Sequence, residues 1–213
     1  MMIKTISDLH EYLTADLSRL ERKPNLKDWL LKNESWFIWR YIYLLRHVEY
    51  HLNSGHKLRY LWYFFFYKRL GFKLHFTIYP NTIGPGFRIY HIGDFVHVGS
   101  NVRIGKNCTL LPGVVFGNKH EIADGGDTSV GDNCYFGLGA KILGSVMIGN
   151  NVTVGTNAVV TKDIPDNAVV GGVPAKVIKM KILNEIKKGG GRLGELLCKL
   201  ILLVEFRAWR SAV

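Results

Sequence analysis

A six-residue period in the middle of the chain constrains the fold more than any other feature. The first apolar series is Ile92, Val98, Ile104, Leu110 and Phe116, and the second is Val130, Phe136, Ile142, Ile148, Val154 and Val160. Most of these residues are followed directly by glycine. The period matches neither the helical repeat of about 3.6 residues nor the two-residue alternation of a strand. It fits a chain that forms a short strand, turns by about 120° and repeats, so that three repeats make one triangular coil.

The glycines and asparagines between the apolar positions indicate where the coil turns. We expect the apolar residues to point inward, and the glycine and the polar residue after it to occupy corners, where positive φ is cheap. Asn107, Asn133 and Asn151 fit such corners. The two series are out of phase by two residues, which predicts a loop at 117–129. Stacked coils would pair their strands in parallel.

The segments on either side of the repeats have different patterns. Residues 1–80 have apolar residues at three- and four-residue steps, which predicts helices, and Asn33-Glu-Ser35 offers an N-cap for one of them. After the repeat region at 81–179, residues 180–213 contain a glycine linker at Gly189–Gly191, and the final stretch is either a short helix or an atypical tail. The sequence therefore predicts a mainly β protein with a helical N-terminal region and a C-terminal tail.

Charge and composition narrow the functional class. The formal net charge is +11, but residues 81–161 hold five basic and five acidic side chains, so the excess lies at both flanks. This distribution favours a local anion site or a membrane surface over a nucleic-acid groove, and the aromatic and basic stretch Arg59–Lys73 is compatible with peripheral membrane contact. No apolar run of about 18 residues predicts a membrane span, and no signal peptide is visible. Three separated cysteines indicate a reducing compartment, and we expect a cytoplasmic protein.

The repeats IGKN, VGDN, IGNN and VGTN resemble those of the hexapeptide-repeat acyltransferases, and Val159–Lys179 resembles the segment that ends the repeat domain in that family. This resemblance is to the serine acetyltransferase-like and polysaccharide O-acetyltransferase branch. It implies a left-handed parallel β-helix, acetyl-CoA as the acyl donor and no metal. It also implies a homotrimer, with a hexamer through the N-terminal helices as a further option. A non-catalytic β-helix scaffold remains an alternative.

One histidine is the candidate general base. No cysteine or serine lies in a nucleophile motif, which favours direct transfer from the thioester to a hydroxyl. The resemblance places the catalytic histidine at His91, with His97 and His120 as weaker candidates. Asp94 and Asp127 are the two candidates for the carboxylate that orients it.

Two departures from the serine enzymes bear on the acceptor. Those enzymes have an aspartate immediately before the catalytic histidine, where this chain has Tyr90, and a second histidine near the end of the loop, where this chain has Asp127. The sequence therefore predicts transfer to a hydroxyl of a sugar or a surface-polysaccharide precursor. L-Serine, the acceptor in cysteine biosynthesis, is the alternative.

The resemblance also implies where acetyl-CoA would bind. Its amide-rich arm would contact corner residues matching Gly117, Leu138 and Thr156. Cations would hold its phosphates. The matching positions are Thr161, Lys162, Lys176 and Lys179. No phosphate-binding P-loop and no dinucleotide-binding glycine motif is present.

Overall fold

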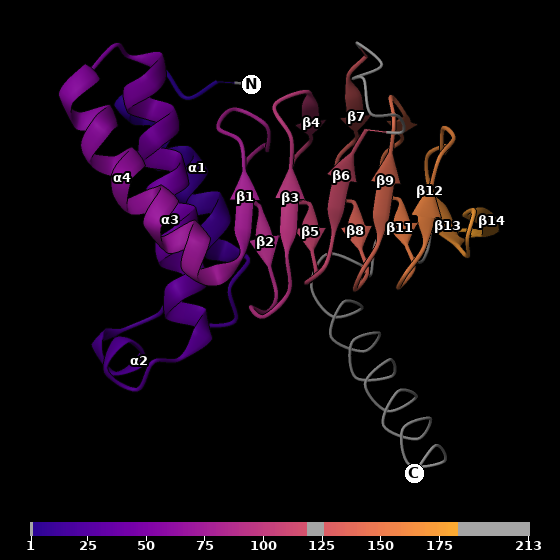
Figure 1. Ribbon diagram of the computed structural model, residues 1–213, viewed down its shortest axis with the longest axis horizontal. Helices are drawn as coiled ribbons and strands as arrows, with labels where there is room; N and C mark the ends of the chain where they lie inside the picture. The colour runs from indigo at the N-terminus through magenta and orange to yellow at the C-terminus, as the bar shows by residue number, and fades with distance from the viewer. Residues whose placement is uncertain (1, 119–125, 183–213) are drawn as a thin grey trace. The chain divides into compact units, whose positions relative to one another are not determined.

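The computed structural model describes residues 2–118 and 126–182, and the chain divides into a unit at 1–179 and a second unit at 180–213 (Figure 1). The predicted tail helix and most of the loop predicted at 117–129 lie outside the described residues. None of the described helices is long and apolar enough to cross a membrane.

Four helices form the N-terminal region, as the sequence predicts. They are α1 (Ile6–Ser18), α2 (Leu26–Leu30), α3 (Glu34–Asn53) and α4 (Lys57–Leu74). A capping box between Thr5 and Asp8 starts α1. Helices α3 and α4 pack together around a stacked pair, in which the Tyr41 hydroxyl donates to the Tyr67 hydroxyl at 2.8 Å.

The rest of the first unit consists of short strands, most of which pair in parallel. They are β1 (Phe76–Ile78), β2 (Arg88–Ile89), β3 (Val96–Val98), β4 (Val102–Ile104), β5 (Thr109–Leu110), β6 (Val115–Gly117), β7 (Thr128–Val130), β8 (Tyr135–Phe136), β9 (Lys141–Leu143), β10 (Met147–Ile148), β11 (Thr153–Val154), β12 (Val159–Val160), β13 (Ala168–Gly171) and β14 (Lys176–Met180).

These strands form three sheets, which the chain visits in turn. The first sheet has the order β1-β3-β6-β9-β12, the second β10-β7-β4 and the third β14-β13-β11-β8-β5-β2. Strands one lap apart pair in parallel, so that Val154 lies opposite Phe136 and Val160 opposite Ile142, eighteen residues earlier. A lap of eighteen residues is three repeats of six, as the period predicts.

The predicted apolar series forms the core, with one exception. Val98, Leu110, Phe136 and Val154 are fully buried. Ile92 is only partly buried and lies outside the strands, because the segment before β3 does not continue the coil. The prediction that Ile92 opens the inward-facing series is therefore wrong.

The corners confirm one part of the turn prediction and correct another. Asn107, Asn133 and Asn151 adopt φ of 57°, 58° and 58°. Most glycines after the apolar positions have ordinary φ, and close approach to the next coil explains four of them instead, at Gly105, Gly131, Gly137 and Gly149. A Cβ on Gly131 would lie 2.8 Å from the carbonyl carbon of Gly149 in the next coil, which is closer than such atoms can approach.

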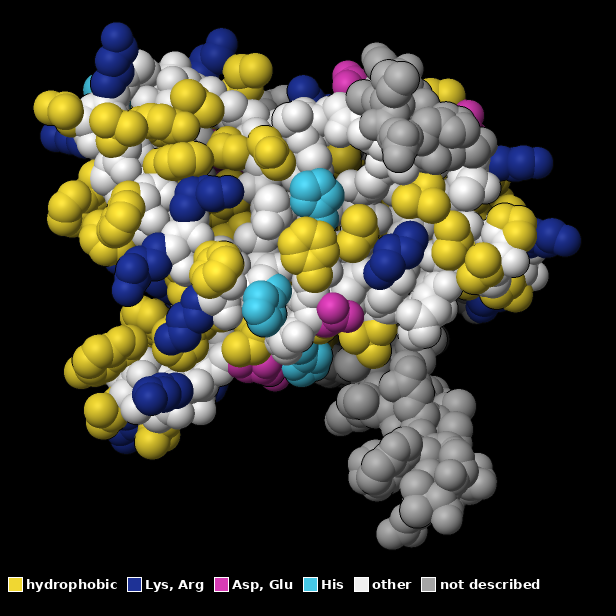
Figure 2. Space-filling view, in the orientation of Figure 1, with side chains coloured by type: hydrophobic (Ala, Val, Ile, Leu, Met, Phe, Trp, Pro, Cys, Tyr) yellow, Lys and Arg dark blue, Asp and Glu magenta, His cyan; other side chains and the backbone are white. Residues whose placement is uncertain are grey.

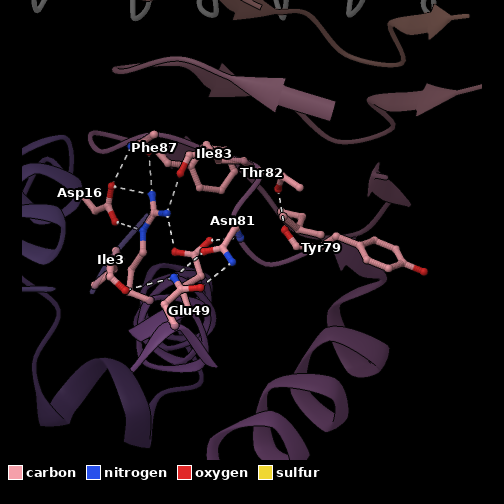
Figure 3. A network of polar contacts seen from close by, with 12 residues as sticks. Ile3, Asp16, Glu49, Tyr79, Asn81, Thr82, Ile83 and Phe87 are labelled. Atoms are coloured by element: carbon pink, nitrogen blue, oxygen red, sulfur yellow. Dashed lines mark hydrogen bonds and ion pairs between the residues drawn. The ribbon is translucent and has the colours of Figure 1, made fainter. Parts of the chain in front are cut away.

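A buried ionic cluster joins the helices to the first coil (Figure 3). Arg46 of α3 donates to Asp16 of α1 at 2.8 Å and to Glu49 at 3.0 Å, and all three side chains are buried. Its guanidinium also donates to the carbonyl oxygens of Ile83 and Gly84, each at 2.8 Å. The two carboxylates in turn accept backbone N–H groups of the first coil, so the cluster fixes α1 and α3 against it.

Candidate functional site

His91 lies where the chain passes from the third sheet to the first, between β2 and β3. Its Nδ1 lies 2.8 Å from Oε1 of Glu34, and the two side chains are 48% and 42% exposed. The other carboxylate oxygen of Glu34 accepts the backbone N–H of Ile92 at 3.4 Å. One carboxylate therefore contacts both the candidate base and the segment that carries it.

Glu34 is the first residue of α3, and the sequence alone did not single it out as an orienting group. Asn33 is the N-cap residue, as predicted, but its side chain donates to Asp28 and does not cap the helix. A carboxylate in the first turn interacts favourably with the positive end of the helix dipole. The fold brings Glu34 to His91 across 57 residues of sequence, and no local sequence pattern predicts a contact over that separation.

The two aspartates expected to orient His91 have other surroundings. The Asp94 carboxylate accepts the N–H of Phe95 at 2.7 Å and lies close to Gly113, where a Cβ would be 2.6 Å from Oδ2. Asp127 is exposed immediately before β7. Among the described residues, Glu34 is the carboxylate that pairs with His91.

Several predicted site residues share one corner of the fold, which we call the His91 corner. It comprises the turns from the third sheet to the first, at 90–95, 111–114, 137–140 and 155–158. Backbone hydrogen bonds connect the last three of these turns, from Gly139 N–H to the Pro112 carbonyl at 2.9 Å and from Asn157 N–H to the Leu138 carbonyl at 2.7 Å. The Asp94 carboxylate of the first turn lies close to Gly113 of the second. His91, Asp94, Leu138 and Thr156 therefore lie along one line parallel to the stacking direction.

Thr156 has a feature that suits a ligand. Its hydroxyl oxygen is buried and has no hydrogen-bond partner in the described part of the chain. An unpaired buried hydroxyl costs free energy unless a water or a ligand satisfies it. The hydroxyl therefore has unused hydrogen-bonding capacity at this corner.

The remaining predicted donor contacts lie at the next corner, where the chain leaves the first sheet. Gly117 ends β6 and Thr161 follows β12. A cavity of about 200 Å³ opens there, lined by Tyr79, His97, Gly99, Ser100, Asn101, Phe116, Gly117 and Asn118. Burial lowers the pKa of His97, which stacks on Phe95 at 5.8 Å between ring centroids. The structure therefore separates His97 from the His91 corner.

The three predicted phosphate-binding lysines lie at the far end of the stack. Lys162 is exposed after β12, and Lys176 and Lys179 lie on β14, the edge strand of the third sheet. The turn before β14 reaches β12, because Ala175 N–H donates to the Val159 carbonyl at 2.8 Å. The His91 corner thus leads from the candidate base toward these cations. The described residues hold no cluster of three or more metal-ligating side chains.

Stacked parallel strands built from six-residue repeats define a hexapeptide-repeat protein. Two family models built on such repeats also match the sequence. Residues 127–162 match the bacterial transferase hexapeptide family of six repeats, and residues 95–123 match the hexapeptide repeat of succinyl-transferase. The repeat region is therefore similar to the hexapeptide-repeat transferases, and serine acetyltransferases are among the relatives of this chain.

Those relatives are similar over about half of the chain. Serine acetyltransferase from Mycobacterium tuberculosis is 40% identical over 47% of this chain and 44% of its own length. The Bacillus pumilus enzyme is 36% identical over 46% of this chain and 44% of its own length. The matched segment thus spans less than half of these curated relatives.

Solved structures show the same likeness over more of the chain. Neisseria gonorrhoeae serine acetyltransferase superposes with a TM-score of 0.64 at 25% identity, covering 84% of this chain and 69% of that one. Serine acetyltransferase from Brucella abortus, solved with coenzyme A, has the same TM-score at 24% identity, and the match covers 82% of this chain and 67% of that one. At this level of identity the likeness supports the fold alone.

Proposed function

We propose that this protein is an acetyl-CoA-dependent O-acetyltransferase in which His91 is the general base and Glu34 orients it. The observation that carries the proposal is the 2.8 Å contact between the His91 ring and Glu34. A carboxylate bonded to Nδ1 holds the imidazole in the tautomer whose Nε2 is free to accept a proton. The named activity of the similar proteins supports the same reaction class.

The proposed reaction is a direct transfer. Nε2 of His91 takes the proton of the acceptor hydroxyl as its oxygen attacks the thioester carbonyl, which gives a tetrahedral oxyanion. Collapse of that intermediate breaks the carbon–sulfur bond and expels the CoA thiolate. The imidazolium then returns the proton to the sulfur, so the enzyme ends in its starting state.

L-Serine is the acceptor that we propose to test first. The relatives and neighbours reported above are named serine acetyltransferases, so the comparisons support the alternative from the sequence better than the predicted sugar acceptor. A sugar hydroxyl is the second candidate, because Tyr90 and Asp127 replace the aspartate and histidine expected of serine enzymes.

Acetyl-CoA is proposed to lie along the His91 corner. From the turn at 90–95 to the turn before β14 there are four coil steps, which at about 4.8 Å each give about 19 Å. An extended pantetheine arm over this distance would put the thioester near His91 and the phosphates near Lys162, Lys176 and Lys179. Leu138 and Thr156 would contact the arm between those ends, and Gly117 and Thr161 would contact it from the neighbouring corner.

The finer features of the architecture and assembly are also proposals. We propose a left-handed coil, as the resemblance implies, and a homotrimer in which a neighbouring subunit completes the acceptor pocket, with a hexamer through the helices as an option. A cytoplasmic site of action fits a soluble thioester donor. Handedness and subunit number would follow from a crystal structure.

An assay of thiol release tests the proposed function. The purified full chain would be mixed with acetyl-CoA and either L-serine or a panel of sugars. We expect His91→Ala to lower kcat by about 10²–10⁴-fold while CoA still binds, as measured by calorimetry. The matched control is His10→Ala, an exposed histidine on α1, which should keep the parent rate.

The outcomes separate the base from the acceptor. Activity with sugars alone would replace L-serine as the acceptor and leave His91 as the base. CoA binding without transfer to any acceptor would favour the non-catalytic scaffold. Unchanged turnover in the His91→Ala variant would overturn the assignment of the base.

A further inference from the structure

The outward side of α4 is apolar although no described element covers it. Helix α4 packs inward through Tyr67, Gly71 and Leu74. Five large apolar side chains on the other side have exposed fractions between 59% and 88%: Leu58, Leu61, Trp62, Phe65 and Phe72. Single exposed apolar residues are common on soluble proteins, but a contiguous group on one helix marks an interaction surface.

The spacing of these residues makes them one stripe, which we call the α4 stripe. Leu58, Phe65 and Phe72 are seven residues apart, so they lie almost in line along the helix, and Leu61 and Trp62 flank that line. Figure 2 shows apolar and basic side chains interleaved over the helical part of the molecule.

Basic side chains border the α4 stripe on both edges. At about 100° per residue, Lys57 and Lys68 fall on one edge and Arg59 and Lys73 on the other, with Arg69 inside the stripe. All five are exposed. An apolar stripe between two rows of cations is the arrangement of a helix that lies in the plane of a membrane interface.

The charge of the surrounding sequence selects the partner. From Tyr50 to Gly93 the chain contains no aspartate or glutamate. Two copies meeting through their α4 stripes would therefore bring ten cations together without a compensating carboxylate from this segment. An anionic lipid surface supplies both the negative charge and the apolar layer that the stripe requires.

We propose that the α4 stripe docks this protein on anionic bilayers. Leu58, Trp62 and Phe65 enter the boundary between headgroups and acyl chains, while Lys57, Arg59, Lys68 and Arg69 contact lipid phosphates. The proposal does not depend on the reaction at His91. It concerns a helix that lies on the membrane, and the described helices are not long and apolar enough to cross one.

Vesicle flotation tests the proposal with the full chain. Vesicles of phosphatidylcholine alone would be compared with vesicles containing phosphatidylglycerol, at low and at physiological salt. We expect binding to the anionic vesicles that weakens with salt. Trp62→Gln combined with Phe65→Gln should reduce binding at least tenfold. Lys68→Glu combined with Arg69→Glu should reduce it at least about 25-fold, at about fivefold for each lost cation, because the two added carboxylates also repel the anionic lipid.

Matched controls separate the stripe from general charge and hydrophobicity. Met147→Gln removes an exposed apolar side chain on β10, and Lys106→Glu reverses an exposed lysine in a corner of the coil; neither should alter flotation. Circular dichroism would check that every variant is folded. Absence of flotation at low salt, or equal binding to neutral vesicles, would overturn the proposal. So would a concentration-dependent mass that Phe65→Gln abolishes, because that result assigns the stripe to self-association.

Discussion

Replacing Glu34 with glutamine tests the contact on which the proposed catalytic site depends. Glutamine keeps the size of the side chain and an oxygen that accepts from Nδ1, so it removes the charge and little else. When His91 takes the acceptor proton, its ring becomes positive 2.8 Å from the carboxylate. Glu34→Gln therefore removes an attraction that grows as the transition state forms.

The size of the effect follows from the exposure of the pair. Opposite unit charges about 4 Å apart attract by about 1 kcal/mol in water and by about 4 kcal/mol at an effective dielectric constant near 20. Side chains that are 48% and 42% exposed belong near the lower value. A loss of about 1–2 kcal/mol lowers kcat by about 5–30-fold.

The assay is steady-state thiol release, with kcat and KM for acetyl-CoA measured separately. Because Glu34 acts through His91, we expect kcat to fall while KM and the melting temperature stay close to the parent values. Glu21→Gln is the matched control, since Glu21 is another exposed glutamate in an ion pair, with Arg88 at 3.3 Å. An unchanged kcat in Glu34→Gln would refute the orienting role, and equal losses in both variants would show a general effect of charge.

Two further predictions concern stability. Arg46→Met leaves Asp16 and Glu49 buried without their cation, so we expect the free energy of unfolding to fall by about 3–5 kcal/mol. The melting temperature should fall by about 10 °C. A melting temperature unchanged within error would contradict the role of the cluster. Burial, with the charges of His51 and Arg40, lowers the pKa of His47 from 6.5 to about 4. Protons therefore bind the unfolded chain first, and stability is lost as pH falls from about 6.5 to 4. A phenylalanine at position 47 has no titrating ring nitrogen and can keep the stacking on Tyr63. Between pH 7 and pH 5, the free energy of unfolding measured in urea should therefore fall less in His47→Phe than in the parent, whereas His10→Gln should behave like the parent.

The sequence predicted features that repeat and missed features that depend on one long-range contact. The six-residue period predicted the three sheets, because the same side-chain direction recurs in every coil. The corner asparagines were predicted for the same reason, and their φ values confirm it. The sequence predicts positive φ for the glycines after the apolar positions, whereas four of them are required by close approach to the next coil, which depends on a stacking distance that the sequence does not contain.

The partner of His91 was missed for a related physical reason. The sequence points to Asp94 and Asp127 because they are near His91 in sequence or follow the loop, whereas Glu34 comes from a helix packed against the first coil. An acidic residue at the start of a helix is usually explained by its favourable interaction with the helix dipole. Its presence therefore does not indicate a partner elsewhere in the chain. The roles of Asp94 and Asp127 and the acetyl-CoA contacts stay predictions.

The buried cluster explains how a helix can place Glu34 with useful precision. Arg46 and Glu34 lie on the same helix, twelve residues apart, which is about 18 Å at about 1.5 Å per residue. Arg46 fixes one part of α3 to Ile83 and Gly84 of the first coil, and Glu34 meets the same coil at His91 and Ile92. Because an α-helix between two such contacts is stiff, the position of the carboxylate follows from the anchor. The helical region is therefore part of the proposed catalytic site, although the similar serine acetyltransferases match only about half of the chain.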